Sequence, residues 1–551
     1  MPSFRTLRCT LAAWLGVAAA FGSAAGARGE QPLREVLDAE LKQAWEREEV
    51  QSAGPADDAT FLRRGYLDLT GAVPTYDETR AFLDDADAQK REKLVDRLLA
   101  DPRYARQQAT VWDLVLFTRD PASDVRARPG FQKWLTAQFE KNVPYDEWVR
   151  AILLAEGNSI DDGAPTFFGA YRNRQMDLSE SVARIFLGQQ IQCARCHNHP
   201  YEDVSQLDFY GMAAFYERLA VVRAGKQGTE ERIFIGEKSA GEILFTGPAI
   251  DDKAGQKGEP VSPKFLFGEE LDEPELPQNF NAVDRFPEGK APPKPFFSRK
   301  EKIAEWVVAP ENPYFAKAVV NRVWAQYMGR GLVHPVDNMG ETSLPSHPEL
   351  LEAMTTAFVA HDFDLKWLVR EIVNSASYQI GSRGSSDRAF PRWFERARVR
   401  PLTAEELPVA IRTATGFDDA ARQAGKDPAQ EREIGNLNRY MNVYFADIEN
   451  GVGDYQASLF EHLYLDNSGD VSQIINRRDG NLLDKLLDEA QPPEARVNRL
   501  YLSVLNRAPT EVETRRFVEY VSQAQDAAAR NRAWHDAVWA LLNSSEFRFN
   551  H

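Results

Sequence analysis

The chain has 551 residues, of which 43% are hydrophobic and 27% are charged, and its formal net charge is −17. This length suits roughly two to four domains, and the composition is that of an ordinary globular protein. The acidic balance argues against a nucleic-acid partner, because binding to phosphates requires a basic face.

The first residues have the pattern of an export signal. Arg5 and Arg8 precede the apolar stretch TLAAWLGVAAAFGSAAGA, whose last three residues fit a small-x-small cleavage site. We expect residues 1–27 to be a signal peptide, with an uncleaved anchor as the alternative. The mature protein is then expected to be periplasmic or secreted and to have no stable membrane span. Cleavage would remove Cys9 and leave Cys193 and Cys196. In an oxidising compartment, two such cysteines are expected to be bonded to each other or to a ligand.

Residues 31–221 are predicted to form a helical N-terminal domain. Leucines at positions such as Leu94 and Leu98 recur at helical spacing, and another helical run begins at Phe131 and is interrupted by Pro144.

Two further helices are predicted on either side of the cysteines. The run DLSESVARIFLGQQIQC is expected to be helical up to the cysteines, with Asp177 or Ser179 as its cap. The run QLDFYGMAAFYERLAVV after them is expected to be helical again.

The next part of the chain changes character. In residues 222–295, short β-branched runs alternate with Gly and Pro, which predicts a small β-containing or irregular insert that ends in a linker. Helical patterns return afterwards, so residues 296–551 are predicted to form a C-terminal helical domain. The fold class is therefore mainly α, with two helical domains and an insert between them.

One segment of the chain is repeated. YLDLTGAVPTYDETRAF, from Tyr66, and YLSVLNRAPTEVETRRF, from Tyr501, share eight residues at identical spacing. Proline followed by Thr and Glu marks a turn that leads into a helix, so each copy is predicted to be a helix-turn-helix hairpin. Packing and capping explain the shared residues better than catalysis does.

Cys193, Cys196 and His197 form a C-x-x-C-H motif, which is the attachment signature of c-type haem. Two thiols three positions apart lie on one side of a helical turn, where both reach one porphyrin edge, and the adjacent imidazole reaches the iron. Covalent haem c, with His197 as the axial iron ligand, is therefore one interpretation.

Two other interpretations of the motif stay open. A zinc site would use Cys193, Cys196 and either His197 or His199, with a remote residue as a further ligand. A disulfide between the two cysteines is the third interpretation, although no thioredoxin-like βαβ pattern surrounds them. His199 is a weaker ligand candidate, because Pro200 turns it away from His197; a hydrogen bond to Glu202 or Asp203 fits it better. Methionines are candidates for a distal ligand by type alone: Met176, Met212, Met328 and Met339.

The longer motifs resemble a known family. YLDLTGAVPT, KLVDRLLADPRY and CARCHNHPYEDVSQLDFYGMAAF are similar to domain of unknown function 1549, the first of two paired planctomycete domains. PENPYFAKAVVNRVWAQYMGRGLVHPVDNMGETSLPSHPELLEAMTTAFV, DLKWLVREIVNSASYQ and WALLNSSEFRFNH resemble the second, domain of unknown function 1553. The resemblance covers nearly the whole mature chain.

The resemblance adds expectations about the site. The first domain carries a cytochrome-c-like name because of a C-x-x-C-H-x-H-P motif, which Cys193, Cys196, His197, His199 and Pro200 match. This supports haem and an exported location. Further cysteines, often found in the second domain of the family, are absent here, as is a separate small cytochrome domain. Any electron partner would therefore be another protein.

Four common catalytic and nucleotide-binding signatures are absent from the sequence: G-x-S-x-G, Walker, G-x-G-x-x-G and H-E-x-x-H. We therefore expect a monohaem c-type redox protein, although the residues do not specify a reaction. The alternative is a helical scaffold or partner-binding protein whose Cys/His cluster is a structural metal site or a disulfide.

Overall fold

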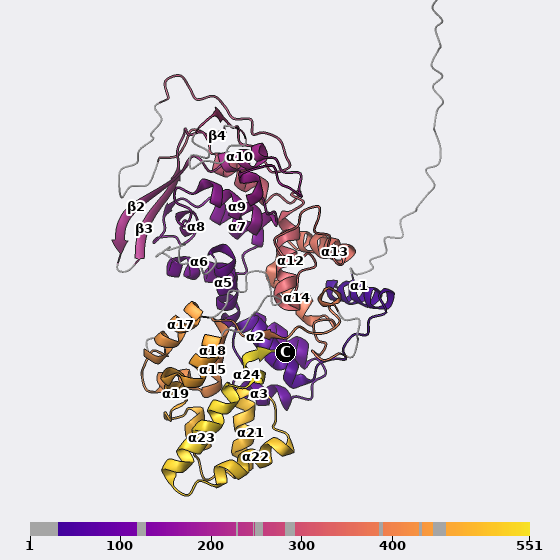
Figure 1. Ribbon diagram of the computed structural model, residues 1–551, viewed down its shortest axis with the longest axis vertical. Helices are drawn as coiled ribbons and strands as arrows, with labels where there is room; N and C mark the ends of the chain where they lie inside the picture. Colours follow the sequence, from indigo (N-terminus) through magenta and orange to yellow (C-terminus); the bar gives the residue numbers. More distant parts are fainter. Residues whose placement is uncertain are drawn as a thin grey trace, which may run out of the picture.

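The computed structural model describes residues 31–117, 128–227, 230–245, 247, 257–280, 293–384, 390–428, 432–444 and 459–551. The predicted signal peptide, residues 1–27, lies outside the described residues. The predicted mainly α fold is confirmed: the described parts of the chain hold 24 α-helices and a few short strands (Figure 1). Along these parts, no helix has both the length and the apolar character that crossing a membrane requires.

The helical patterns of the N-terminal part correspond to ten helices. They are α1 (Leu33–Arg47), α2 (Asp58–Thr70), α3 (Tyr76–Leu83), α4 (Lys90–Leu99), α5 (Pro102–Phe117), α6 (Arg128–Glu140), α7 (Tyr145–Leu153), α8 (Thr166–Gly169), α9 (Gln175–Leu187) and α10 (Gln206–Ala214). The break predicted at Pro144 separates α6 from α7, and Pro144 is the N-cap of α7. Proline suits a helix start because its missing N–H has no partner there in any case.

The strands form three small sheets. They are β1 (Gly157–Asn158), β2 (Leu219–Gln227), β3 (Glu230–Glu237), β4 (Leu244–Phe245), β5 (Glu259–Pro260), β6 (Arg400–Pro401) and β7 (Phe549–Asn550). β3 lies between β1 and β2 and is antiparallel to both, with Leu219 opposite Glu237 and a bulge between Arg223 and Lys226. β4 pairs with β5, and β6 with β7. The predicted insert thus contains β-structure, as expected from its β-branched runs.

Helices make up most of the rest of the chain. They are α11 (Arg299–Val307), α12 (Phe315–Met328), α13 (Pro348–Ala360), α14 (Leu365–Asn374), α15 (Glu406–Thr415), α16 (Phe417–Gln423), α17 (Arg432–Tyr444), α18 (Leu459–Asn467), α19 (Gly469–Ile475), α20 (Leu482–Leu486), α21 (Pro493–Val504), α22 (Glu511–Ser522), α23 (Ala527–Leu542) and α24 (Ser545–Arg548).

The described residues pack around two hydrophobic cores. The first takes residues between Leu33 and Phe394, and therefore combines α1–α10 with α11–α14. The second takes residues between Leu402 and Phe547, together with Leu67 of α2 and Val73 after it. α2 thus contributes to both cores, and Figure 1 shows it beside the C-terminal helices. The predicted boundaries after residues 221 and 295 stay predictions, while the first core draws on both predicted helical domains.

The two repeated segments are the predicted helix-turn-helix hairpins, α2–α3 and α21–α22. Thr75 caps α3 and Thr510 caps α22, each in a capping box with the Glu three residues later. α3 packs against α21, so the two copies meet although they lie at opposite ends of the sequence. Arg63 of α2 strengthens this junction: its guanidinium donates to the carbonyl oxygens of Val504 (3.2 Å) and Phe547 (2.6 Å).

Candidate cysteine–histidine site

The motif forms a compact turn after a helix that ends earlier than expected. α9 stops at Gly188, whose φ of +65° is left-handed and free of strain for glycine. A short 3-10 helix, Gln192–Arg195, then carries the first cysteine. The backbone amides of Cys196 and His197 face the Cys193 carbonyl oxygen at 3.3 and 3.4 Å. The prediction that one helix continues to the cysteines is therefore wrong. The cap assignment is also wrong, because Arg174, rather than Asp177 or Ser179, is the N-cap of α9.

The reactive atoms of the turn face solvent. Cys193 and His197 are exposed, Cys196 is partly exposed, and both thiols are free. Ala194, between the cysteines, is fully buried and belongs to the first core. The apolar contact of Ala194 therefore anchors the turn, while the sulfur atoms and the imidazole stay accessible to a ligand.

The ring of His197 is held in a defined tautomer. Its Nδ1 lies 2.7 Å from the carbonyl oxygen of Asn198. A carbonyl oxygen only accepts, so Nδ1 carries the proton and donates it in this hydrogen bond. In the neutral ring the lone pair is then on Nε2. A backbone carbonyl that accepts from Nδ1–H is one of the usual partners that orient a metal-ligating histidine.

His199 has the opposite arrangement. Its Nδ1 accepts the backbone N–H groups of Tyr201 at 3.3 Å and Glu202 at 2.9 Å. The Nδ1 lone pair is therefore occupied, and the proton of the neutral ring is on Nε2. Coordination through Nε2 would require moving that proton to Nδ1, which would break both hydrogen bonds. The hydrogen bond expected between His199 and Glu202 is therefore present, and the Glu202 backbone amide is its donor.

Polar contacts hold the rest of the motif segment. Gln206, at the start of α10, donates its backbone amide to Asn198 Oδ1 (3.0 Å) and its side-chain amide to the Arg195 carbonyl oxygen (3.2 Å). Arg195 forms an ion pair with Asp177 of α9 (2.9 Å). Burial alone would raise the pKa of Asp208, but hydrogen bonds from Lys264 and Ser205 hold that pKa below its ordinary value. The helices on both sides of the turn thus fix its position.

Large apolar side chains are exposed close to the turn. Tyr201 is 75% exposed, Leu207 is 53% exposed and Leu344 is 82% exposed. Tyr201 and Leu207 flank the motif in the sequence. Leu344 lies two residues after Thr342, whose hydroxyl donates to the Glu202 carboxylate. Exposed apolar side chains near one site are typical of a binding surface.

The structure does not bring a further metal ligand to the turn among the described residues. In the described parts of the chain, no three His, Cys, Asp or Glu side chains form a group that could hold a metal ion. Three of the candidate methionines are buried: Met176, Met212 and Met328. Met339 is partly buried, and its side chain lies so close to Gly188 that a Cβ there would be 2.9 Å from its sulfur.

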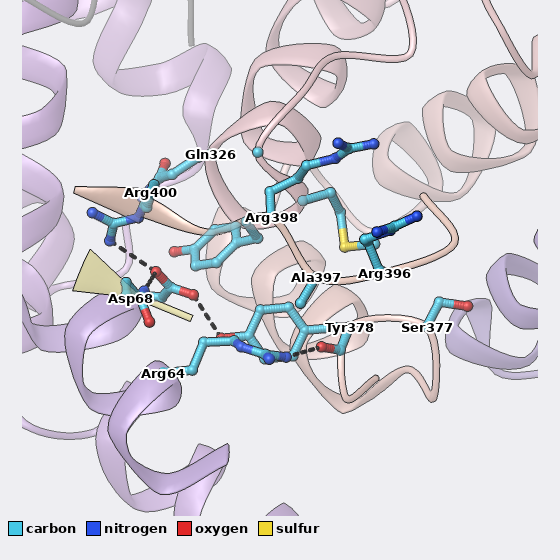
Figure 2. Close-up of a pocket in the computed structure, with 13 residues that line it drawn as sticks. Arg64, Asp68, Gln326, Ser377, Tyr378, Arg396, Ala397, Arg398 and Arg400 are labelled. Carbon is cyan, nitrogen blue, oxygen red and sulfur yellow. Dashed lines mark hydrogen bonds and ion pairs between the residues drawn. The ribbon is translucent and has the colours of Figure 1, made fainter. Parts of the chain in front are cut away.

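A buried polar network, which sequence reasoning missed, joins α2 to the segment after α14 (Figure 2). Asp68 accepts from the Tyr378 hydroxyl at 2.7 Å and from Arg400 at 2.9 Å. Arg400 also binds Glu406, at 2.6 Å. Asn550, near the end of the chain, donates its side-chain amide to Asp68 at 2.7 Å. The only local signal was the presence of three charged residues, Arg63, Arg64 and Asp68, within the otherwise largely apolar α2 sequence FLRRGYLDLT.

The Asp68 network fits a structural role. The pocket beside it has a volume of about 20 Å³, which admits water and no larger substrate. Burial raises the pKa of Asp68, and the nearby Arg400 opposes this shift. Arg64 donates to the carbonyl oxygens of Tyr378 and Ile380 at 2.6 and 2.9 Å. These contacts connect distant parts of the chain across the molecule.

Comparison with known proteins identifies two families and no characterised relative. Residues 36–220 match the family model PSCyt2, described as a protein of unknown function (DUF1549), and residues 299–443 match PSD1, a protein of unknown function (DUF1553). No curated protein and no solved structure matches the chain. The first matched segment contains the whole cysteine–histidine turn. The chain thus belongs to the proteins that pair the DUF1549 and DUF1553 domains.

Proposed function

We propose that Cys193, Cys196 and His197 hold one covalently attached haem c, and that the exported protein transfers electrons to or from another protein. The orientation of the His197 ring is the observation that carries this proposal. Its Nδ1–H is bound to the Asn198 carbonyl oxygen at 2.7 Å, which leaves the lone pair of the exposed Nε2 for a metal.

The cysteines supply the covalent attachment. Each thiol would add across one vinyl group of the porphyrin, with the sulfur bonded to one vinyl carbon and the thiol proton to the other. The addition is redox-neutral and needs no oxidant or reductant. Such addition requires two free thiols at one edge of the ring. Both Cys193 and Cys196 are free, they lie on the same turn, and neither is buried. When bound, haem would supply a reversible one-electron couple at its iron.

The surroundings of the turn also suit a large flat ligand. Tyr201 and Leu207, which flank the motif in the sequence, present apolar surface to solvent. Covering such surface with a porphyrin would stabilise the complex by about 25 cal/mol for each Å² removed from water. His199 is not available for the iron in this arrangement, because Nδ1 accepts two backbone amides.

The test is the pigment of the full-length protein, produced in a host that attaches haem c in an oxidising compartment. We expect a Soret band that survives denaturation and acid–acetone extraction, and a mass increase of one haem. Cys193→Ala should abolish the double thioether, and His197→Gln should remove the axial ligand and change the spectrum.

His199→Asn is the matched control, because an Asn side chain also offers an oxygen acceptor to the two backbone amides. It should keep the wild-type spectrum. A colourless wild-type protein would refute the haem proposal. Stoichiometric zinc in that colourless protein would instead assign the turn to a structural metal site, and a disulfide between Cys193 and Cys196 would assign it to a covalent cross-link.

A further inference from the structure

A segment of the second matched domain, residues 337–342, lies against the chain on both sides of the cysteine–histidine motif. On the side before the motif, Asp337 accepts hydrogen bonds from Arg184 at 3.0 Å and Gln190 at 3.1 Å. The Met339 backbone amide donates to the Gly188 carbonyl oxygen at 2.7 Å. This side of the segment thus fixes the chain that leads from α9 into the turn.

On the side after the motif, the contact is made through one carboxylate. Glu202 accepts the Glu341 backbone amide at 2.6 Å on Oε2 and the Thr342 hydroxyl at 2.9 Å on Oε1. Gly340 allows this approach, because a Cβ at that position would lie 2.2 Å from a Glu202 carboxylate oxygen. Hydrogen bonds to an ionised carboxylate are stronger than those between neutral groups.

The segment is held by its own domain. Asn321 of α12 is fully buried and donates to the carbonyl oxygens of Val333 at 2.9 Å and Val336 at 3.1 Å. Its side-chain oxygen accepts the Val333 backbone amide at 2.9 Å. A buried amide with three such bonds fixes the backbone just before residue 337. α12 therefore sets the position of the segment.

Glu202 is connected to the motif through the backbone. Its amide donates to His199 Nδ1 at 2.9 Å, and its carbonyl oxygen accepts the Val204 amide at 2.8 Å. The His199 amide in turn donates to the Val204 carbonyl oxygen at 2.8 Å. These bonds close residues 199–204 into a small loop, which is separated from His197 by Asn198 alone. A carboxylate held at Glu202 thus holds the loop that follows His197 and Asn198.

We propose that residues 337–342 of the second domain position the cysteine–histidine turn, and that Glu202 is the positioning residue through which they act. The inference concerns the site of the proposed function, but it describes the turn itself and applies with or without haem. The two paired domains then build one site together, because the first carries the reactive side chains and the second fixes their geometry.

The test compares variants from both domains in two preparations of the full-length chain, made without and with haem attachment. Glu202→Ala removes the acceptor, and Gly340→Ala places a methyl group against it from the other domain. Glu202→Gln is the conservative variant, because its amide accepts from Glu341 and donates to the Thr342 hydroxyl. Asp203→Ala removes the neighbouring exposed carboxylate and is the matched control.

The readout in the preparation without haem is amide hydrogen exchange of the peptide that spans residues 191–205. We expect exchange to become about tenfold faster or more in Glu202→Ala and in Gly340→Ala, with unchanged global unfolding. Glu202→Gln and Asp203→Ala should resemble the wild type. In the preparation with haem, the two disruptive variants should also shift the reduction potential, which a change that only destabilises the fold would leave unaltered.

Wild-type exchange in both Glu202→Ala and Gly340→Ala would overturn the inference. A fast-exchanging Glu202→Gln would also contradict it, because the rescue would have failed. The absence of pigment would overturn only the haem proposal, since the exchange experiment does not depend on haem.

Discussion

The cysteine–histidine turn and the Asp68 network use polar side chains in opposite ways. In the turn, His197 is exposed, and its hydrogen bond to Asn198 uses one ring nitrogen and leaves the other available. In the network, both carboxylate oxygens of Asp68 are bonded, and the side chain is buried. The comparison shows the difference between the two roles. An exposed side chain with a free hydrogen-bonding atom can bind a ligand, whereas a buried side chain whose hydrogen bonds are all made stabilises the fold.

The strongest challenge to this comparison is to break the Asp68 network. Arg400→Met leaves the buried carboxylates of Asp68 and Glu406 without their cation. We expect the free energy of unfolding to fall by about 3 kcal/mol or more, because a buried charge that loses its partner is not solvated. Denaturant titration measures this loss. The exposed Arg172 offers the control variant Arg172→Met, which should change stability by less than about 0.5 kcal/mol. Equal losses of unfolding free energy in the two variants would show that the network does not stabilise the fold.

The second prediction concerns a buried histidine, His347, at the N-terminus of α13. His347 packs against the rings of Trp393 and Phe394, and burial, aided by the charge of Arg47, lowers its pKa from 6.5 to about 4. The unfolded chain then binds a proton at a pH where the folded protein does not. The stability contribution is complete above pH 6.5 and is lost as the pH falls toward 4.

The size of this effect follows from the shift in pKa, which corresponds to about 3 kcal/mol between the two pH values. Denaturant titrations of the wild type and His347→Phe across this range measure it. The advantage of the wild type over the variant should shrink as the pH falls. A difference that stays constant with pH would contradict the prediction.

The smallest effect is expected at the turn itself. In protein prepared without haem, His197→Gln and Cys193→Ser should each change the free energy of unfolding by less than about 0.5 kcal/mol, because both side chains are exposed. The measurement is again denaturant titration. A loss of about 2 kcal/mol or more, of the order expected for a buried hydrogen-bonded group, would mean that the turn, like the Asp68 network, belongs to the structural interior.

Local patterns predicted much of the fold. The shared spacing of Pro, Thr and Glu correctly placed the starts of α3 and α22, because a capping box is complete within four residues. The C-x-x-C-H motif was likewise readable because its three side chains are close in sequence. Features that depend on residues close in the sequence can therefore be predicted from the sequence.

Errors arose where one residue overrode a longer pattern. α9 ends at Gly188, a glycine just past the last helical residue and therefore an available stop signal, yet the apolar spacing favoured continuing. The helix predicted to end in ERLAVV stops at Ala214, and β2 begins at Leu219. There, pairing with β3 outweighs the helical spacing of the apolar residues.

The remaining features depend on contacts between distant residues. Glu202 and Thr342 are 140 positions apart, and Asp68 and Arg400 are 332 positions apart. The sequence around each of these residues does not indicate which distant residue it contacts. Their pairing depends on how α12 and the segment after α14 pack on the N-terminal helices, and helical spacing does not specify that packing.

The hydrogen bonds of Arg63 have a consequence for the order in which the molecule assembles. Its guanidinium reaches partners 441 and 484 positions later in the chain. A ribosome that has made the first hairpin must synthesise most of the remaining polypeptide before these acceptors exist. Until then a cation destined for the interior lacks its native partners, so the hairpin that forms first in sequence is among the last to be completed.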